Sequence, residues 1–194
     1  QNFYTEKYGV VHPTKAGLKI PEIFDAAINR EVKAVWIIGE DVVQTDPNSA
    51  HVAKAMNALD LLVVQEIFMS ETAKHADVVL PGTTFLEKDG TFTNTERRVQ
   101  RVNKAAEPLK GTKPDGLIVT EMMQKLGYKQ KSYDADEVLA EIADVVPFFK
   151  GITRERLGKL GLQWPVKEDG TDTKILHEKE FKLGKGRIKY FDWK

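Results

Sequence analysis

Polar side chains that can bind a ligand follow each of three apolar runs in the first half of the chain. The runs are Val32–Ile38, Leu61–Val64 and Val78–Leu80. The polar side chains are Glu40, Asp41, Thr45 and Asp46 after the first run, Gln65 and Glu66 after the second, and Glu87, Lys88, Asp89, Asn94 and Glu96 after the third. If the runs are neighbouring parallel strands, their carboxyl ends meet at one edge of a sheet, where open α/β sheets bind ligands. The spacing therefore predicts one ligand site built from three loops.

These residue types fit a nucleotide-like ligand. A carboxylate such as Glu40 or Glu66 accepts hydrogen bonds from ribose hydroxyls or from the N–H edge of guanine. Lys88 stands two residues before Gly90, so its ammonium group can approach a phosphate or pterin oxygen where the backbone comes close. The chain has no G-x-G-x-x-G pattern and no Walker loop, so the ordinary NAD and ATP sites are not indicated.

Each of these residues also has a purely structural interpretation, which the spacing alone leaves open. Asp46 and Glu66 can cap the helices that follow them, and Lys88 can be an ordinary surface lysine. The run Glu96–Arg98 fits the solvated face of a hairpin. The four histidines have no metal-ligand spacing and are predicted to be structural or exposed; they are His12, His51, His75 and His177.

Alternating helical and strand patterns position these loops. Apolar spacing predicts a helix over Ile20–Asn29. A second helix is predicted over Ser49–Ala58, capped by Asp46 or Asn48, and a short one follows Ser70. The continuous apolar runs between the helices are typical of parallel strands that are covered on both faces. The fold class is therefore α/β, with a parallel βαβ sheet.

The remaining segments are a loop after the first apolar run and the second half of the chain, whose pattern differs from that of the parallel sheet. Residues 40–47 are predicted as a polar loop, and Thr91–Val102 as a strand or hairpin outside the parallel sheet. Helices are predicted over Pro114–Leu126, Asp134–Val146 and Arg154–Leu160. Lys167–Thr173 is interpreted as a linker, and the aromatic tail to Trp193 as core or interface. A small β segment and helices thus follow the sheet.

The composition excludes several classes of function. With 194 residues, 41% of them apolar, the chain can form a packed core. Basic and acidic residues both number 29, so no net charge attracts nucleic acid or an anionic membrane, and no apolar run reaches the roughly 20 residues of a membrane span. The absence of cysteine excludes an iron–sulfur cluster or zinc thiolate site within the chain and fits a reducing, cytoplasmic compartment.

One long stretch resembles the prokaryotic molybdopterin oxidoreductase family. It comprises Val63–Ala73 (VVQEIFMSETA), Ala76–Pro81 (ADVVLP) and Glu87–Gln100 (EKDGTFTNTERRVQ), preceded by Gly39–Asp41 and Thr45–Asn48. The segment Gly151–Pro165 is most similar to the formate dehydrogenase branch. The resemblance extends from about Lys19 to Trp164 and implies an internal or C-terminal portion of a formate dehydrogenase alpha (catalytic) subunit.

The resemblance implies a cofactor, bis(molybdopterin guanine dinucleotide) carrying molybdenum or tungsten. By matching positions, Glu40 would lie at a guanosine-side loop, and Gln65 and Glu66 would contact one guanosine. Lys88 would contact the pterin or phosphate region of the cofactor, and Asp115 would contact its guanine end. Some relatives have Asn in place of Glu40 and Ser-Asp in place of Gln65 and Glu66, which retains oxygen acceptors. No catalytic residue and no metal ligand is implied within this chain.

In the intact relative, formate would be oxidised to carbon dioxide, and two electrons would pass through the pterin to a 4Fe–4S cluster. The cluster cysteines, the metal-ligating selenocysteine or cysteine and the substrate-binding His and Arg would all lie upstream. The implied partners are the remainder of the catalytic subunit and electron-transfer subunits, without nucleic acid or membrane, and this chain alone would be inactive. Residues 1–166 would form the cofactor-binding core segment, with a β insertion near 87–104, and residues 167–194 would form a linker and the start of a final domain.

Three other interpretations remain open at this point. The first is another member of the family, such as a nitrate reductase, or the related large subunit of an NADH dehydrogenase complex. The second is a non-catalytic split subunit or binding module that requires a complementary chain. The third is a structural domain that kept the fold and lost the cofactor.

Overall fold

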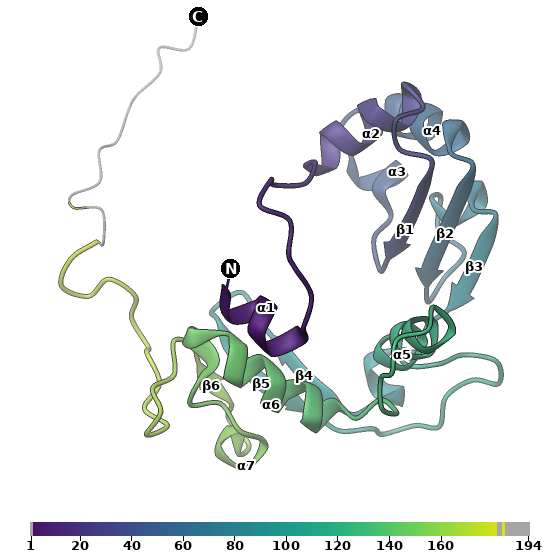
Figure 1. The fold of residues 1–194 in the computed structure, drawn as a ribbon. Helices are drawn as coiled ribbons and strands as arrows, with labels where there is room; N and C mark the ends of the chain where they lie inside the picture. The colour runs from purple at the N-terminus through teal and green to yellow at the C-terminus, as the bar shows by residue number, and fades with distance from the viewer. Residues whose placement is uncertain (1, 182–183, 185–194) are drawn as a thin grey trace, which may run out of the picture. The chain divides into compact units, whose positions relative to one another are not determined.

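The computed structural model describes residues 2–181 and residue 184, and the chain divides into two compact units (Figure 1). Unit 1 comprises residues 1–90 and 102–135, and unit 2 comprises residues 91–101 and 136–194. Each unit has its own hydrophobic core. The domain boundary that we predicted after residue 166 stays a prediction.

Unit 1 is an α/β unit in which helices alternate with three strands. Its strands are β1 (Ala34–Ile38), β2 (Leu61–Glu66) and β3 (Val78–Pro81). Its helices are α1 (Asn2–Tyr8), α2 (Ile20–Ile28), α3 (Val42–Thr45), α4 (Ser49–Ala58) and α5 (Asp115–Lys125), with 3₁₀ turns η1 (Ala73–His75) and η2 (Phe85–Glu87). The predicted helices over 20–29, 49–58 and 114–126 are confirmed to within a residue or two.

The three strands form a parallel sheet in the order β1-β2-β3 (Figure 1). Ile38 of β1 is in register with Gln65 of β2, and Gln65 is in register with Leu80 of β3. The carboxyl ends of the strands therefore lie at one edge, as the sequence predicted. The backbone continues this pairing beyond β1, because the amide of Gly39 donates to the carbonyl of Gln65 at 2.9 Å.

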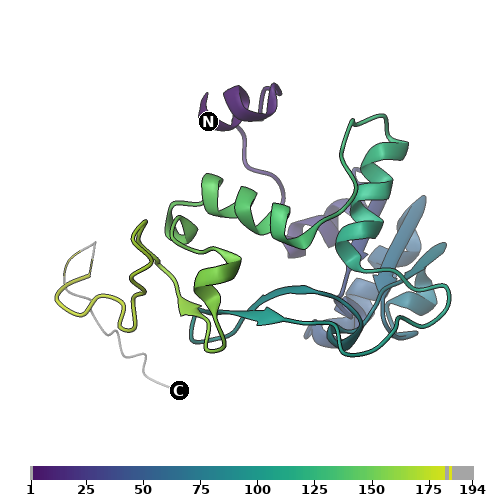
Figure 2. The same cartoon turned by 90° about the horizontal axis from the view of Figure 1, so that it is seen from below.

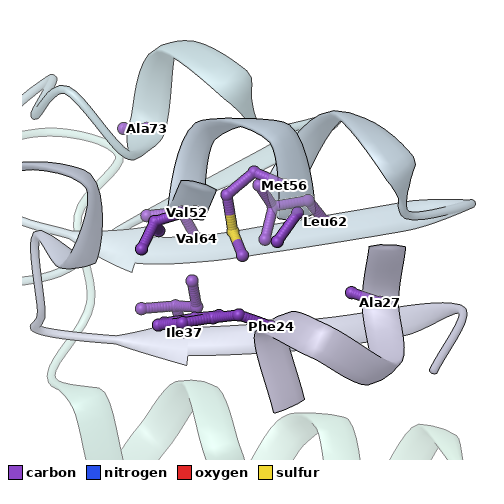
Figure 3. Packing of buried hydrophobic residues seen from close by; sticks show 9 residues of the cluster. Phe24, Ala27, Ile37, Val52, Met56, Leu62, Val64 and Ala73 are labelled. Carbon is purple, nitrogen blue, oxygen red and sulfur yellow. The ribbon is translucent and has the colours of Figure 1, made fainter. Parts of the chain in front are cut away.

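Helices α2 and α4 pack on one face of this sheet and bury its alternate residues (Figure 3). The buried cluster consists of Phe24 and Ala27 of α2, Val52, Ala55 and Met56 of α4, Ile37 of β1, Leu62 and Val64 of β2, and Ala73. Apolar residues three or four apart on each helix produce the stripe that faces the strands. Burial of these side chains is the main stabilising term for unit 1.

The opposite face of the sheet is only partly covered, so the prediction of strands buried on both faces is wrong for the described residues. Ile38, Leu61 and Val78 point away from the buried cluster by strand alternation, and they are 46%, 41% and 42% exposed. Gln65 lies on the same face but is 0% exposed, because other parts of unit 1 cover that end of the sheet.

Two short elements differ from the prediction. Residues 42–45, predicted as loop, form the single helical turn α3. Asn48 rather than Asp46 caps α4, since its side chain accepts from the amide of His51 at 3.3 Å, while Asp46 accepts from the amide of Asn48. Ser70 does cap the turn that follows it, with its hydroxyl oxygen accepting from the amide of Ala73 at 3.2 Å.

Unit 2 is a small antiparallel sheet with helices against it (Figures 1 and 2). Its elements are β4 (Gly90–Thr93), β5 (Arg98–Val102) and β6 (Leu162–Gln163), helices α6 (Ala135–Val145) and α7 (Arg154–Leu157), and the 3₁₀ turn η3 (Pro147–Phe149). The predicted β segment and helices after the parallel sheet are confirmed. Its core consists of Val99, Leu139, Ile152, Leu157 and Val166.

Arg97 at the tip of the β4–β5 hairpin links this hairpin to two later segments of unit 2. Its guanidinium donates to the carbonyls of Trp164, Thr173 and Lys174, and it lies 5.7 Å from the centre of the Trp164 ring. This residue, predicted as part of a solvated hairpin face, is half-buried instead.

Most of the predicted aromatic tail lies outside the described residues. None of the helices within residues 2–181 combines the length and apolarity that a membrane span needs.

Candidate functional site

The first residue of α5, Asp115, is the centre of a polar cluster in unit 1. The side-chain amide of Gln65 donates to Asp115 Oδ1 at 2.8 Å. The ammonium group of Lys88 donates to Asp115 Oδ2 and also to the carbonyl of Thr83 at 3.2 Å. These three residues are separated by up to 50 positions in the sequence, and together they form what we call the Asp115 cluster.

Local sequence explains how each member is positioned. Gln65 is held by its register between Ile38 and Leu80. Lys88 follows η2, whose start is fixed by a capping box in which Glu87 accepts from the amide and hydroxyl of Thr84. Pro114 precedes Asp115 and favours the start of a helix there.

Gly82 allows the carboxylate to lie close to the end of β3. A Cβ atom at position 82 would be 3.1 Å from Asp115 Oδ1, which is tighter than ordinary packing. The amide of Lys113 also donates to the carbonyl of Pro81 at 3.1 Å, which draws the start of α5 to this edge of the sheet. The ligand-binding edge predicted from the strands is therefore also where α5 begins.

The cluster keeps Asp115 ionised. Burial by itself raises the pKa of Asp115, but the hydrogen bonds from Lys88 and Gln65 and the charge of Lys88 outweigh it, so its pKa is lowered. Burial and the negative charges of Asp115 and Asp134 raise the pKa of Tyr133, which therefore stays protonated. At neutral pH the cluster presents a carboxylate and an ammonium group with side chains that are 39% and 21% exposed.

Two polar atoms near this edge are buried without a hydrogen-bond partner among the described residues. They are Oε1 of Gln65 and Oγ1 of Thr83. Gln65 and Thr83 are 0% and 1% exposed, so neither side chain reaches the surface. The prediction that Gln65 contacts a guanosine directly stays a prediction, and the structure gives this side chain a contact to Asp115.

The other two predicted site residues lie at the same sheet edge but outside the cluster. Glu40 accepts from the hydroxyl of Thr45 at 2.8 Å and lines a cavity of about 280 Å³ with Phe24, Val42 and Asp46, among others. Glu66 accepts from the amide of Ile67 at 2.7 Å. Among the described residues, no hydrogen bond or ion pair joins either carboxylate to Asp115, so the structure brings together Gln65, Lys88 and Asp115 only.

Three neighbours of the cluster were not predicted from the sequence, namely Gly82, Thr83 and Tyr133. In the sequence, Gly82 is notable only for following the apolar run Val78–Leu80 and Pro81. Tyr133 lies against Gly116, where a Cβ atom would be 2.1 Å from its ring. No pattern in the sequence pairs these two positions, because the contact depends on how the chain returns after α5.

The described residues contain no group of three or more His, Asp or Glu side chains that could hold a metal ion. His51 pairs with Asp25 at 3.0 Å, and His75 contacts the side chain of Asn57 at 2.9 Å. Both histidines therefore have structural contacts, as predicted.

Comparison with known proteins identifies the family. The molybdopterin oxidoreductase family model matches residues 9–125. The F420-dependent formate dehydrogenase subunit alpha of Methanocaldococcus jannaschii is 46% identical over 179 residues, which cover 91% of this chain and 26% of that protein. A Staphylococcus aureus (strain USA300) protein named as a formate dehydrogenase is 41% identical over 189 residues, which cover 97% of this chain and 19% of that protein.

A solved structure with the same fold belongs to the acetylene hydratase of Pelobacter acetylenicus. Its TM-score is 0.56 with 22% sequence identity, over 70% of this chain and 19% of that one. This likeness supports the α/β fold of the chain and nothing finer.

The chain belongs to the molybdopterin oxidoreductase family, which implies a molybdopterin cofactor. Within that family it is formate dehydrogenase-like, since the relatives that cover most of its length have that name. The chain spans between a fifth and about a quarter of the length of these relatives.

Proposed function

We propose that this chain contributes part of the binding site for a molybdopterin guanine dinucleotide in a formate dehydrogenase-like enzyme. The observation that carries the proposal is the Asp115 cluster, where an ionised carboxylate and an ammonium group lie side by side at the carboxyl edge of a parallel sheet. This edge is the usual ligand-binding position of an α/β unit.

The donors and acceptors present fit such a cofactor. The carboxylate of Asp115 can accept from the N–H groups of guanine, and each of its oxygens retains a further lone pair. Lys88 can compensate the charge of a phosphate or hydrogen-bond a pterin oxygen. Glu40 and Glu66 add carboxylates at the ends of β1 and β2 that suit ribose hydroxyls.

When bound, the cofactor would supply the two-electron redox chemistry that converts formate to carbon dioxide, with molybdenum or tungsten as its metal. The residues of this chain would bind and orient the nucleotide end and place no side chain on the metal. We propose that the cofactor is bis(molybdopterin guanine dinucleotide), which this chain helps to bind. A 4Fe–4S cluster and the substrate-binding residues would belong to the rest of a longer catalytic subunit, with electron-transfer subunits as partners. The short span of this chain on its relatives supports that division.

The proposal is tested by titrating the chain with GDP, and with ADP in parallel, while amide NMR signals are recorded. GDP should shift the signals around Gln65, Lys88 and Asp115, and ADP should bind about tenfold more weakly, because adenine lacks the guanine N1–H donor. Equal shifts with both nucleotides, or none at this edge, would reject the guanine site.

The contribution of Lys88 is tested by Lys88→Met. Loss of the ammonium group should weaken GDP binding by about tenfold, since it removes one charge-assisted contact. Lys150→Met is a matched control, because Lys150 forms an ion pair with Glu168 in unit 2 and lies outside the cluster. If both variants bind GDP as wild type does, the role assigned to Lys88 is wrong.

A further inference from the structure

Gln65 is the only residue of the cluster whose side chain is completely buried. It is 0% exposed and its strand neighbours in register are the apolar Ile38 and Leu80. Its Nε2 atom donates to Asp115 Oδ1 at 2.8 Å, which also fixes the orientation of the amide, since the opposite orientation would place two oxygens together.

That orientation leaves Oε1 of Gln65 buried with no partner among the described residues. A buried carbonyl oxygen that has lost its water without gaining a donor destabilises the fold. An unbranched apolar side chain of similar length, such as methionine, would fill the same space without that penalty. Fold stability therefore does not explain why position 65 has an amide side chain.

Another buried glutamine, Gln163, shows the contrast. Gln163 in unit 2 is 6% exposed, and its Nε2 atom donates to the backbone carbonyl of Glu96 at 3.0 Å. None of its side-chain atoms is buried without a partner. Gln163 fastens β6 to the hairpin, so its amide has a structural explanation that Gln65 lacks.

We infer that Gln65 is a positioning residue, which holds the Asp115 carboxylate in one orientation for a ligand without touching that ligand itself. Gln65 holds Oδ1 and Lys88 holds Oδ2, which restricts rotation of the carboxylate plane, while the lone pairs that remain can accept an incoming N–H donor. Orienting an acceptor before binding reduces the entropy lost when the ligand binds. This inference rests on the proposed guanine site and differs from the direct guanosine contact predicted for Gln65 from the sequence.

The charged and titratable groups around the carboxylate are few, which makes its ionisation a useful measurement. Lys88 from the segment after η2 and Gln65 from β2 stabilise the charged form, and Tyr133, with Asp134 next to it, lies against Gly116 in the first turn of α5. Removing the Gln65 donor should raise the pKa of Asp115, because one of its stabilising hydrogen bonds disappears.

The test compares Gln65→Met with Gln163→Met in the full 194-residue chain. For Gln65→Met we expect a melting temperature within about 4 °C of wild type, GDP binding weakened by about tenfold, and an Asp115 carboxyl titration in NMR moved to higher pH. For Gln163→Met we expect the reverse, namely a clear loss of melting temperature with GDP binding unchanged.

A second variant, Gln65→Glu, has nearly the shape of glutamine and keeps the test valid if Gln65→Met does not fold. Above its pKa, the new carboxylate repels Asp115, whereas its protonated form can donate as the amide does. GDP binding should therefore be weak at pH 8 and recover towards wild type at pH 5. A purely structural role for Gln65 would produce no such recovery.

The outcomes separate this inference from the function on which it rests. If wild type does not bind GDP, the guanine site is wrong and the inference with it. If wild type binds GDP but Gln65→Met binds equally well, or if the Asp115 titration does not move, the guanine site stands and Gln65 does not position Asp115. A large loss of stability in Gln65→Met with unchanged binding overturns the inference in the same way.

Discussion

Asp41 shows how one carboxylate can hold two ligand-site loops together. It follows β1, and its Oδ1 accepts from the amide of Thr72 at 2.8 Å and from the hydroxyl of Thr72 at 2.6 Å. Its Oδ2 accepts from the amide of Glu71 at 3.3 Å. The loop after β1 is thereby fastened to the loop after β2, next to the carboxylates Glu40 and Glu66.

This arrangement predicts how stability depends on pH. Burial alone would raise the pKa of Asp41, but the hydrogen bonds from Thr72, Glu71 and Gln44 lower it from the ordinary value of 3.8. Because the folded protein binds this proton less readily than the unfolded chain, the stabilisation is complete above pH 3.8 and is lost as the pH falls through the lowered pKa. Asp41→Asn should therefore lower the free energy of unfolding by about 1–2 kcal/mol at pH 7 and by progressively less below pH 3.8.

Thermal unfolding of Asp41→Asn and wild type between pH 7 and pH 2.5 measures this difference. Glu31→Gln is a suitable control, since it removes one exposed carboxylate of unit 1 without touching the loops. If the difference in stability between Asp41→Asn and wild type stays constant down to pH 2.5, the ionised form of Asp41 does not stabilise the fold.

At the scale of residues, the sequence predicted which side chains stand at the strand ends but not what they contact. Gln65, Lys88 and Asp115 were all candidate site residues, and the structure brings them together. Their mutual hydrogen bonds could not be predicted, because Asp115 is 50 positions after Gln65 and its approach depends on packing around Gly82. The burial of Gln65 has the same cause, since alternation fixes the face of the sheet but not what covers it.

At the scale of elements, periodicity predicted the long helices and the three parallel strands, while the short turn α3 was missed. The turn α3 has only four residues, too few for a periodic pattern to be recognised. Helix α7 was predicted to reach Leu160 but ends at Leu157, because Gly158 adopts a φ of +51°. The sequence contains both Gly158 and Gly161, and the predicted end at Leu160, directly before the second glycine, was wrong.

Gly161 has a different role, which predicts a large effect of substitution. Its φ is +72°, and a Cβ atom there would be 2.3 Å from the carbonyl oxygen of Val99 in β5. Gly161→Ala must move β5 or the turn before β6, so we expect the free energy of unfolding to fall by about 3 kcal/mol or more. Gly127 has a φ of +88° with open space around it, so Gly127→Ala should cost only about 1 kcal/mol.

The measurement is the melting of NMR methyl signals from Ile152 and Leu157, which report on the core of unit 2. Gly161→Ala should lower that melting temperature by about 6 °C or more. Gly127→Ala should leave it nearly unchanged, because Gly127 lies in unit 1 and its effect falls on that unit. Equal effects would mean that the β5–β6 turn can relax without cost.

Glu87 provides a second prediction at this scale. It caps η2 through Thr84 and also accepts from the amide of Leu109 at 3.0 Å, so it holds the segment after β5 against the turn that precedes Lys88. Glu87→Ala should increase hydrogen exchange of the Leu109 amide by at least about tenfold, because that amide loses its acceptor. Exchange as slow as in wild type would show that the segment is held by other contacts.

At the scale of the molecule, the described residues of unit 1 cover one face of the parallel sheet more completely than the other. Helices α2 and α4 bury Val64 at 0% exposure, whereas Val78 on the opposite face is 42% exposed. An apolar face of this kind is where further polypeptide commonly packs. The relatives are about four to five times longer than the matched segment, so they contain chain that could cover it.

The same substitution on the two faces measures this difference in the isolated chain. Val64→Thr places a hydroxyl in the buried cluster and should cost about 1–3 kcal/mol, because that environment is apolar. Val78→Thr replaces a half-exposed methyl group, so water can solvate the hydroxyl and the melting temperature should change by less than about 3 °C. Val78→Thr should also lower the binding of a hydrophobic dye, since it makes the exposed face more polar. Equal losses of stability in the two variants would mean that the second face is covered in solution, by self-association or by another part of this chain.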